Sequence, residues 1–131
     1  MILPALLLLL VQDKPIDCDK DQSQLALNIC ADRDFQAADA ALNRQWKIAY
    51  ARMKALDVGY DKDRREGDRS LGYAPALLES QRTWLKYRDA QCTVEGQYMR
   101  GGSGEPMMYS TCMAGLTRDR TTFLAKMLED H

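Results

Sequence analysis

Histidine is almost absent from this sequence, whose one histidine is His131. This scarcity argues against histidine-based acid–base catalysis and His-rich metal sites. Glycine and proline are also sparse, at 8 and 4 residues, which excludes a low-complexity chain. We therefore expect a folded, non-enzymatic protein of single-domain size that needs no metal and no cofactor.

Neither sign of charge dominates, because 18 basic residues face 19 acidic ones and the formal net charge is −1. This balance argues against a sequence-independent nucleic-acid binder and against a polybasic membrane-surface protein. A long apolar run is also missing. The longest one, residues 2–11, is about half of the ~20 residues that a membrane-spanning helix needs. We expect neither a nucleic-acid partner nor a stable membrane span.

The apolar run at residues 2–11 is followed at once by Gln12, Asp13 and Lys14. Its length is typical of the core of a secretory signal peptide, so residues 1–12 are predicted to be one and residues 18–129 to form the single domain. The alternative is a buried N-terminal helix of a cytosolic protein, since no basic residue precedes the run and no small-x-small motif follows it. Lipidation at Cys18 is not predicted, because Asp17 stands where a small residue is required.

Four cysteines, Cys18, Cys30, Cys92 and Cys112, are spaced without a C-x-x-C motif, which disfavours zinc. An even number in a small chain with a leader indicates two disulfides, and hence an oxidising compartment such as the periplasm or the extracellular space. Three pairings are open in principle. Proximity in sequence favours Cys18–Cys30 and Cys92–Cys112, each of which closes a short loop.

Apolar residues at helical spacing predict a first helix that begins at Gln24, after a capping Ser23. Its stripe contains Phe35, Ala38, Leu42, Trp46, Ala49, Met53 and Leu56. Between Asp57 and Tyr73 this periodicity stops, and charged residues alternate with three glycines. We expect a long exposed connection there, with room for one helical turn.

Pro75 suits the first turn of a second helix. One face of this helix carries Leu78, Gln81, Trp84, Leu85, Arg88 and Cys92. Polar groups on a packing face need partners. We therefore interpret Arg88 as a structural lock, paired with a carboxylate or with carbonyls at a helix end while its stem packs on Trp84. The alternative is a binding-site arginine.

Residues 100–106 contain three glycines and a proline, which end the second helix. A third helix then runs to about Glu129, with a face formed by Tyr109, Cys112, Leu116, Arg120, Phe123 and Met127. An antiparallel hairpin of these two helices brings Cys92 level with Cys112. The predicted fold is all-α, a three-helix antiparallel bundle stapled by two disulfides. Its expected core is Leu42, Trp46, Met53, Leu78, Trp84, Leu85, Leu116, Phe123 and Leu124.

Several motifs along the chain resemble a known family, from Cys18 to Leu124. Besides the four cysteines, the matching residues are Leu42, Asn43, Trp46, Gln81, Trp84, Arg88, Asp89, Thr117, Arg120 and Leu124. This pattern is similar to the LprI N-terminal domain of small secreted bacterial proteins. Two positions depart from it conservatively, because Trp46 replaces the more usual Tyr and Ser23 replaces the common Thr.

The resemblance implies a helical, disulfide-bonded, periplasmic or secreted binding protein that inhibits a lysozyme-type muramidase. The alternative is a structural or stress-related envelope protein with another partner. A third hypothesis, a hydrolase, would need carboxylates such as Glu79 or Glu95, which nothing singles out as a pair. The candidate partner-binding residues lie in the glycine-rich turn, and a second candidate is the charged connection at Arg64 and Arg65. The candidates in the turn are Arg100, Gly102, Ser103 and Glu105.

Overall fold

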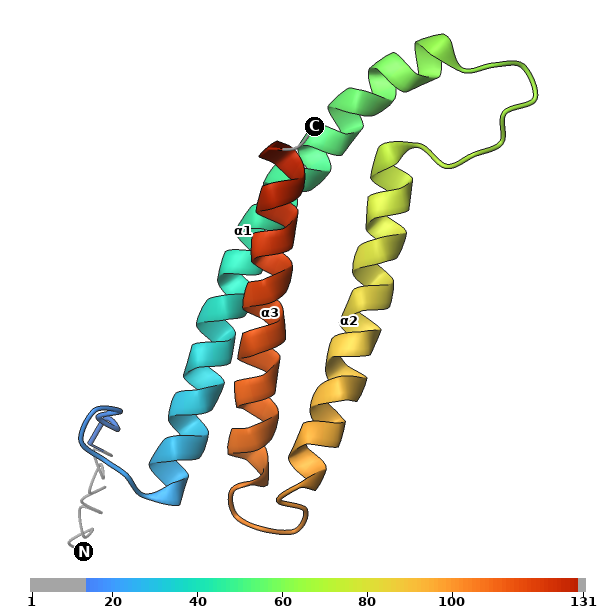
Figure 1. Ribbon diagram of the computed structural model, residues 1–131. Coiled ribbons are helices and arrows are strands. Elements are labelled where there is room, and N and C mark those ends of the chain that lie inside the picture. The colour runs from blue at the N-terminus through green and yellow to red at the C-terminus, as the bar shows by residue number, and fades with distance from the viewer. Residues whose placement is uncertain (1–13, 130–131) are drawn as a thin grey trace, which may run out of the picture.

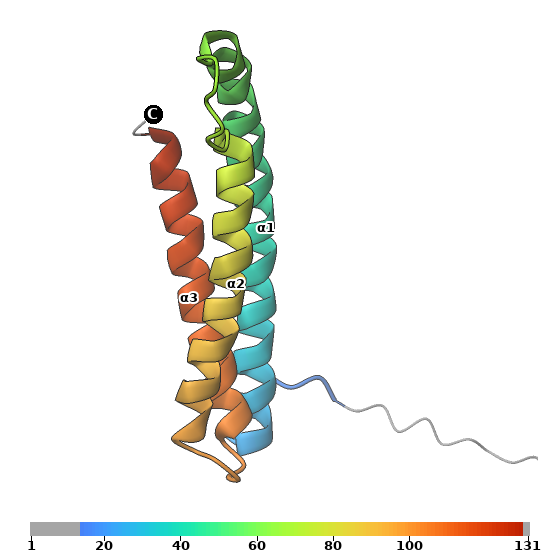
Figure 2. The ribbon, with the colours of Figure 1, turned by 90° about the vertical axis from the view of Figure 1, so that its right-hand side faces the viewer.

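The computed structural model describes residues 14–129, which form three helices and no strand. Helix α1 spans Gln24–Asp63, α2 spans Tyr73–Gln97 and α3 spans Glu105–Glu129. The chain runs up α1, down α2 and up α3 (Figures 1 and 2), and α3 packs mainly on α1. The predicted all-α, three-helix fold is confirmed. The signal peptide predicted at residues 1–12 lies outside the described residues.

Helix α1 begins where the sequence predicts. Ser23 is extended, and its hydroxyl accepts a hydrogen bond from the backbone N–H of Ala26 at 3.2 Å, as a helix cap does. The predicted stripe faces the core. The buried residues of α1 are Ala26, Ala38, Leu42, Ala49 and Met53.

Helix α1 is longer than predicted, because it continues through Gly59 to Asp63 and leaves only residues 64–72 as the connection to α2. A single interior glycine costs a helix only about 1 kcal/mol. The extra turns make contacts that offset this cost. Asp57 accepts hydrogen bonds from the backbone N–H groups of Tyr73 and Ala74, and Tyr60 donates to Asp68.

The face of α2 that packs inward largely matches the prediction, including its two polar positions. The buried residues are Ala74, Leu77, Gln81, Arg88, Cys92 and Gly96. Leu78 and Leu85, which we expected in the core, are half-buried, because Leu77 occupies the position next to the hydrophobic cluster. Pro75 lies in the first turn, as predicted.

On α3 the buried face is rotated by about one residue from the predicted one. It consists of Ser110, Met113, Ala114, Thr117 and Leu124. Phe123 is 58% exposed, so its assignment to the core was wrong, and Leu116 is half-buried. The reason is that α3 packs mainly on α1 through small side chains, which allow the helices to approach closely, whereas the more apolar stripe turns toward α2 and the solvent.

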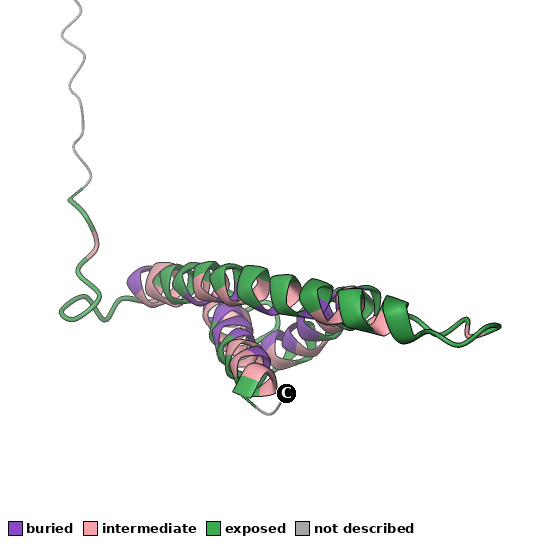
Figure 3. Cartoon of the chain, turned by 90° about the horizontal axis from the view of Figure 1, so that it is seen from above, coloured by how far each residue is buried: buried purple, intermediate pink, exposed green. Residues whose placement is uncertain are grey.

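The hydrophobic core draws on all three helices, on the sides that face one another (Figure 3). Its buried residues are Leu42, Ala49, Met53, Ala74, Leu77 and Leu124, with Trp46 and Trp84 packed against them. The predicted core residues Leu42, Met53 and Leu124 are confirmed, and both tryptophans are half-buried.

Both predicted disulfides are present. Cys18–Cys30 has a Cα–Cα distance of 5.8 Å and joins the segment before α1 to α1 itself. Cys92–Cys112 has a Cα–Cα distance of 5.4 Å and joins α2 to α3, two turns from the tip of their hairpin. Within residues 14–129, no helix is long and apolar enough to cross a membrane.

Candidate partner-binding surface

Arg88 lies at the centre of the bundle and contacts all three helices. It is 7% exposed, and its Nη1 donates to Asp39 of α1 and to Thr117 of α3, both at 3.3 Å. Its Nε donates to Asp89 at 3.1 Å. The guanidinium also lies 5.2 Å from the ring centre of Trp84. These contacts satisfy the buried charge within the protein and leave little of Arg88 exposed, as the interpretation of Arg88 as a structural lock requires.

Most of the other motif residues also serve the fold. Arg120 donates to Gln81 at 3.0 Å and to Ser80 at 2.9 Å, which joins α3 to α2. Burial lowers the pKa of Arg120 from its ordinary value, because desolvation penalises the charged form. Asn43 is exposed and donates to Asp39 at 3.3 Å. Gln81, Arg88 and Arg120 of the family pattern thus make contacts between helices, whereas Asn43 and Asp89 are exposed.

The predicted binding loop is a tight, ordered turn between α2 and α3. The backbone N–H of Gly102 donates to the carbonyl of Met99 at 2.8 Å. Gly101 has a positive φ of 73°, which favours glycine. A Cβ on Gly102 would lie 3.1 Å from the Met99 carbonyl oxygen, so the chain passes itself too closely for a side chain there. The two glycines thus set the shape of the turn.

Two side chains hold this turn from outside it. The Glu105 carboxylate, in the first turn of α3, accepts a hydrogen bond from the backbone N–H of Gly101 at 2.9 Å. Asn28 of α1 donates to the carbonyl of Ser103 at 2.8 Å. Glu105 and Ser103, both predicted to contact a partner, thus have structural roles in which they fix the turn to the bundle.

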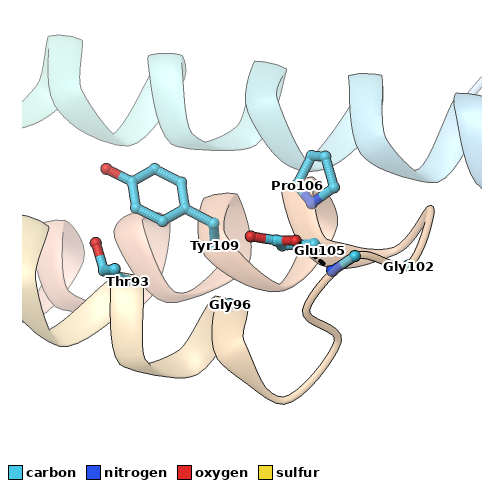
Figure 4. A pocket seen from close by; sticks show the side chains of 7 residues that line it. Thr93, Gly96, Gly102, Glu105, Pro106 and Tyr109 are labelled. Carbon is cyan, nitrogen blue, oxygen red and sulfur yellow. Dashed lines mark hydrogen bonds between the residues drawn. The ribbon is translucent and has the colours of Figure 1, made fainter.

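An open hollow of about 450 Å³ lies beside the turn, between α2 and α3. Tyr109 and Thr93 lie at one end of it and Gly102 at the other, with Glu105 between them (Figure 4). The hollow is open to solvent, which suits a side chain of a partner protein better than an enclosed small molecule. Of the four predicted residues, Gly102 and Glu105 line it.

Three consecutive exposed residues lie at the tip, and of these the Met99 side chain folds back against Gly104. Tyr98 is 77% exposed, Met99 is 41% exposed and Arg100 is exposed as well. The backbone N–H of Arg100 donates to the Gln97 carbonyl at 3.1 Å. Tyr98 and Met99 were missed from the sequence, since their place after the second helix looked like a continuation of its face. An exposed aromatic next to a glycine run was the signal available.

The other candidates are less suited to binding. Arg64 donates to the carbonyls of Asp68 and Ser70 at 3.2 Å and lies over the Tyr60 ring, so it orders its own connection. Arg65 is exposed. Glu95 accepts from Gln91, and Glu79 is exposed on another part of α2. No group of three His, Cys, Asp or Glu side chains in the described part of the chain could hold a metal ion.

The family model "Lysozyme inhibitor LprI" matches residues 17–124. An uncharacterized protein of Rhizobium meliloti (strain 1021) is 45% identical over 136 residues, an alignment that covers 96% of this chain and 94% of that protein. No solved structure matches.

Proposed function

Because the chain belongs to the lysozyme inhibitor LprI family, we propose that it binds and inhibits a lysozyme-type glycosidase through the turn at residues 98–104. In this proposal the protein is a non-enzymatic binding module that acts in the periplasm or outside the cell, with residues 1–12 as its leader and residues 18–129 as its single domain. The two disulfides support an oxidising compartment.

The observation that carries the proposal is a rigid turn that presents an aromatic and a cationic side chain. Binding costs less free energy when the contacting segment is already ordered. Here the Cys92–Cys112 disulfide and the hydrogen bonds of Glu105 and Asn28 order the turn in advance. Tyr and Arg are also the residue types that most often dominate the free energy of protein interfaces.

The chemistry of the proposed target fits this turn. Glycosidases of the lysozyme type cleave their substrate between a pair of carboxyl groups in a cleft. A guanidinium that enters such a cleft gains charge-assisted hydrogen bonds to an ionised carboxylate and blocks the substrate. We assign this role to Arg100, with Tyr98 packing at the rim of the cleft. The hollow beside Tyr109 then receives a side chain from the lysozyme.

The test is the clearing of a cell-wall suspension by c-type lysozyme in the presence of a molar excess of the oxidised protein. We expect the protein to slow clearing, and Arg100→Ala and Tyr98→Ala each to weaken inhibition at least tenfold. Arg82→Ala, an exposed arginine in the middle of α2, is the matched control and should inhibit normally. Unchanged clearing with lysozymes of every class would refute the inhibitor proposal.

A further variant separates the two candidate loops. Arg65→Ala removes an exposed arginine of the connection at residues 64–72. We expect this variant to inhibit normally. If it loses inhibition while Arg100→Ala retains it, the surface is at the opposite end of the bundle, and the assignment to the 98–104 turn is wrong.

A further inference from the structure

Helix α1 has a long outward side that neither α2 nor α3 covers, and the segment before α1 contacts only its start, at Arg33. Both α2 and α3 lie on one side of α1, and exposed residues follow one another along its other side (Figure 3). Positions three or four residues apart share a face of a helix. The successive positions on this side, all exposed, are Arg33, Ala37, Ala40, Arg44, Lys47, Ala51, Lys54, Val58 and Lys62. We call this surface the α1 basic face.

The α1 basic face carries five cations and no acid over about 44 Å of helix. Because the whole chain has a net charge of −1, all residues outside this face together have a net charge of −6. The near-neutral total, which argued against a polybasic surface, thus conceals a segregation of charge by face. Only the three-dimensional placement of the acids shows it.

Four of the five cations of the α1 basic face are available to a partner, whereas Arg33 donates to the backbone carbonyl of Ile16 at 3.1 Å. The salt bridges of the described residues join other groups, such as Arg118 to Asp34 and Arg64 to Asp61. Lys54 lies 5.6 Å from the centre of the Tyr50 ring, a contact that leaves its charge uncompensated. Of the two acids that flank Arg33 in sequence, Asp34 is paired with Arg118 of α3 and Asp32 accepts a hydrogen bond from Gln36.

Apolar side chains stand among these cations. Val58 is 60% exposed, and Ile48, which adjoins Lys47, is 57% exposed. The remaining positions of the face are alanines, whose small side chains let the helix approach a flat surface closely. A second copy of this chain docked through the same face would place like charges opposite each other, and a purely ionic polymer would leave Ile48 and Val58 in water. Cations with apolar residues between them match the boundary between lipid headgroups and acyl chains.

We propose that the α1 basic face docks the protein on the surface of an anionic lipid bilayer, with α1 parallel to the membrane plane. Lysines and arginines near an anionic bilayer each strengthen binding by about fivefold, and Ile48 and Val58 insert between the headgroups. The proposal is independent of lysozyme inhibition, because the 98–104 turn lies at one end of the bundle and the face runs along its side (Figure 1).

Vesicle co-sedimentation tests the proposal, with the purified oxidised protein and two kinds of vesicle, pure phosphatidylcholine and phosphatidylcholine mixed with phosphatidylglycerol. We expect binding to the mixed vesicles alone, and we expect it to weaken steeply between about 0.15 M and about 1 M salt. The triple variant Arg44→Gln, Lys47→Gln and Lys54→Gln should bind on the order of 100-fold more weakly. Binding that needs no anionic lipid would overturn the proposal.

A matched control variant removes the same number of positive charges from α2 and α3. Arg82→Gln, Lys86→Gln and Lys126→Gln replace three exposed cations of α2 and α3 and should leave vesicle binding within about threefold of the parent. Every variant retains the same N-terminal segment, so differences between them report on the helix faces. Equal losses in the two triple variants would show a response to net charge alone and would overturn the proposal.

Ile48→Ser distinguishes a lipid surface from an anionic polymer. It should weaken binding to the mixed vesicles several-fold and leave binding to linear polyphosphate unchanged, because only the bilayer offers an apolar region. If polyphosphate binds more tightly than the vesicles and Ile48→Ser affects neither, the face recognises a polymer of phosphates, and the lipid assignment is wrong.

Discussion

Arg88 illustrates, at the scale of a single residue, a charge that stabilises the fold and is absent from the surface. Its contacts to Asp39 and Thr117 join α2 to both other helices. Arg88→Ala should lower the free energy of unfolding by about 2–4 kcal/mol, because it removes these contacts and leaves a cavity beside Trp84. Urea denaturation measures this change. Arg82→Ala, an exposed counterpart on the same helix, should change it by less than about 0.5 kcal/mol.

The same variant also tests the function of Arg88. If Arg88 is only a lock, lysozyme inhibition per folded molecule stays normal in Arg88→Ala. Weaker inhibition in a variant that unfolds at the parental urea concentration would place Arg88 in the binding surface.

The contribution of Asp68 to the stability of the connection at residues 64–72 should depend on pH. Hydrogen bonds from the hydroxyl and the backbone N–H of Ser70, and one from Tyr60, lower the pKa of Asp68 from 3.8 to about 2. A lowered pKa in the folded state means that the contribution to stability is complete above about pH 4 and is lost as the pH falls through 2. An NMR titration of the Asp68 carboxyl carbon should therefore show a midpoint near pH 2.

Ser70→Ala is the companion variant for this titration. It removes the hydroxyl that contributes most to the shift, so the Asp68 pKa should rise toward 3.8. A midpoint near pH 4 in the parent protein would show that these hydrogen bonds do not persist in solution.

The helix cap and the disulfides were predictable from the sequence, whereas the exposure of Tyr98 and the contact of Glu105 with the turn were not. The Ser23 cap depends on a partner three residues away, and the two disulfides close short loops. Tyr98 was missed because hydrophobic periodicity does not show where a helix face stops being covered. The role of Glu105 as a support for the turn was missed for a related reason, since its partner is a backbone N–H.

At the scale of the helices, α2 depends on α1 for its N-terminal cap. Gly72 has no side chain to offer, and Asp57 accepts from the backbone N–H groups of Tyr73 and Ala74 at 2.5 and 2.9 Å. Asp57→Ala should lower the free energy of unfolding by about 1 kcal/mol, as the loss of a helix cap usually does. Gly72→Ala should cost a similar amount, because its Cβ would lie 2.6 Å from the Asp57 carboxylate and displace it.

These two variants act on one interaction, so their effects should not add. In the double variant the unfolding free energy should fall by about as much as in Asp57→Ala alone, a coupling that urea denaturation of all four proteins detects. Additive losses would show that Gly72 has another role.

The two disulfides should differ in their effect on inhibition. Each closes a loop of 12 or 20 residues, so removing either pair should cost about 3 kcal/mol of stability. Cys92→Ala with Cys112→Ala should also weaken inhibition several-fold, because this pair holds the helices that carry the 98–104 turn. Cys18→Ala with Cys30→Ala is the control, and it should inhibit normally under conditions where both variants are folded. Equal effects on inhibition would contradict the role assigned to the turn.

The helix faces show where prediction from periodicity ends. On α1 the apolar stripe and the buried face coincide. On α3 they do not, because Thr117, which is fully buried, lies outside the predicted stripe. Its hydroxyl accepts from Arg88, so a polar residue became part of the core through a partner 29 positions away. Hydrophobicity alone therefore cannot predict which face of such a helix is buried.

At the scale of the whole molecule, the two proposed binding surfaces lie in different places, which the overall composition does not reveal. The 98–104 turn lies at one end of a rod of three helices, and the α1 basic face lies along its side (Figure 1). The 28% of charged residues and the net charge of −1 give no sign of this separation. It arises because α2 and α3 cover the same side of α1.

This separation predicts that the two proposed activities can be lost one at a time. Arg100→Ala should weaken lysozyme inhibition and leave vesicle binding normal, because Arg100 lies outside the α1 basic face. The triple variant of Arg44, Lys47 and Lys54 should do the reverse. Combining all four substitutions should reduce each activity by the same factor as the corresponding parent variant, since distant sites act additively. Measuring both activities on each protein decides the matter: if either variant impairs both activities, the two surfaces overlap, and the division of the rod into an end and a side is wrong.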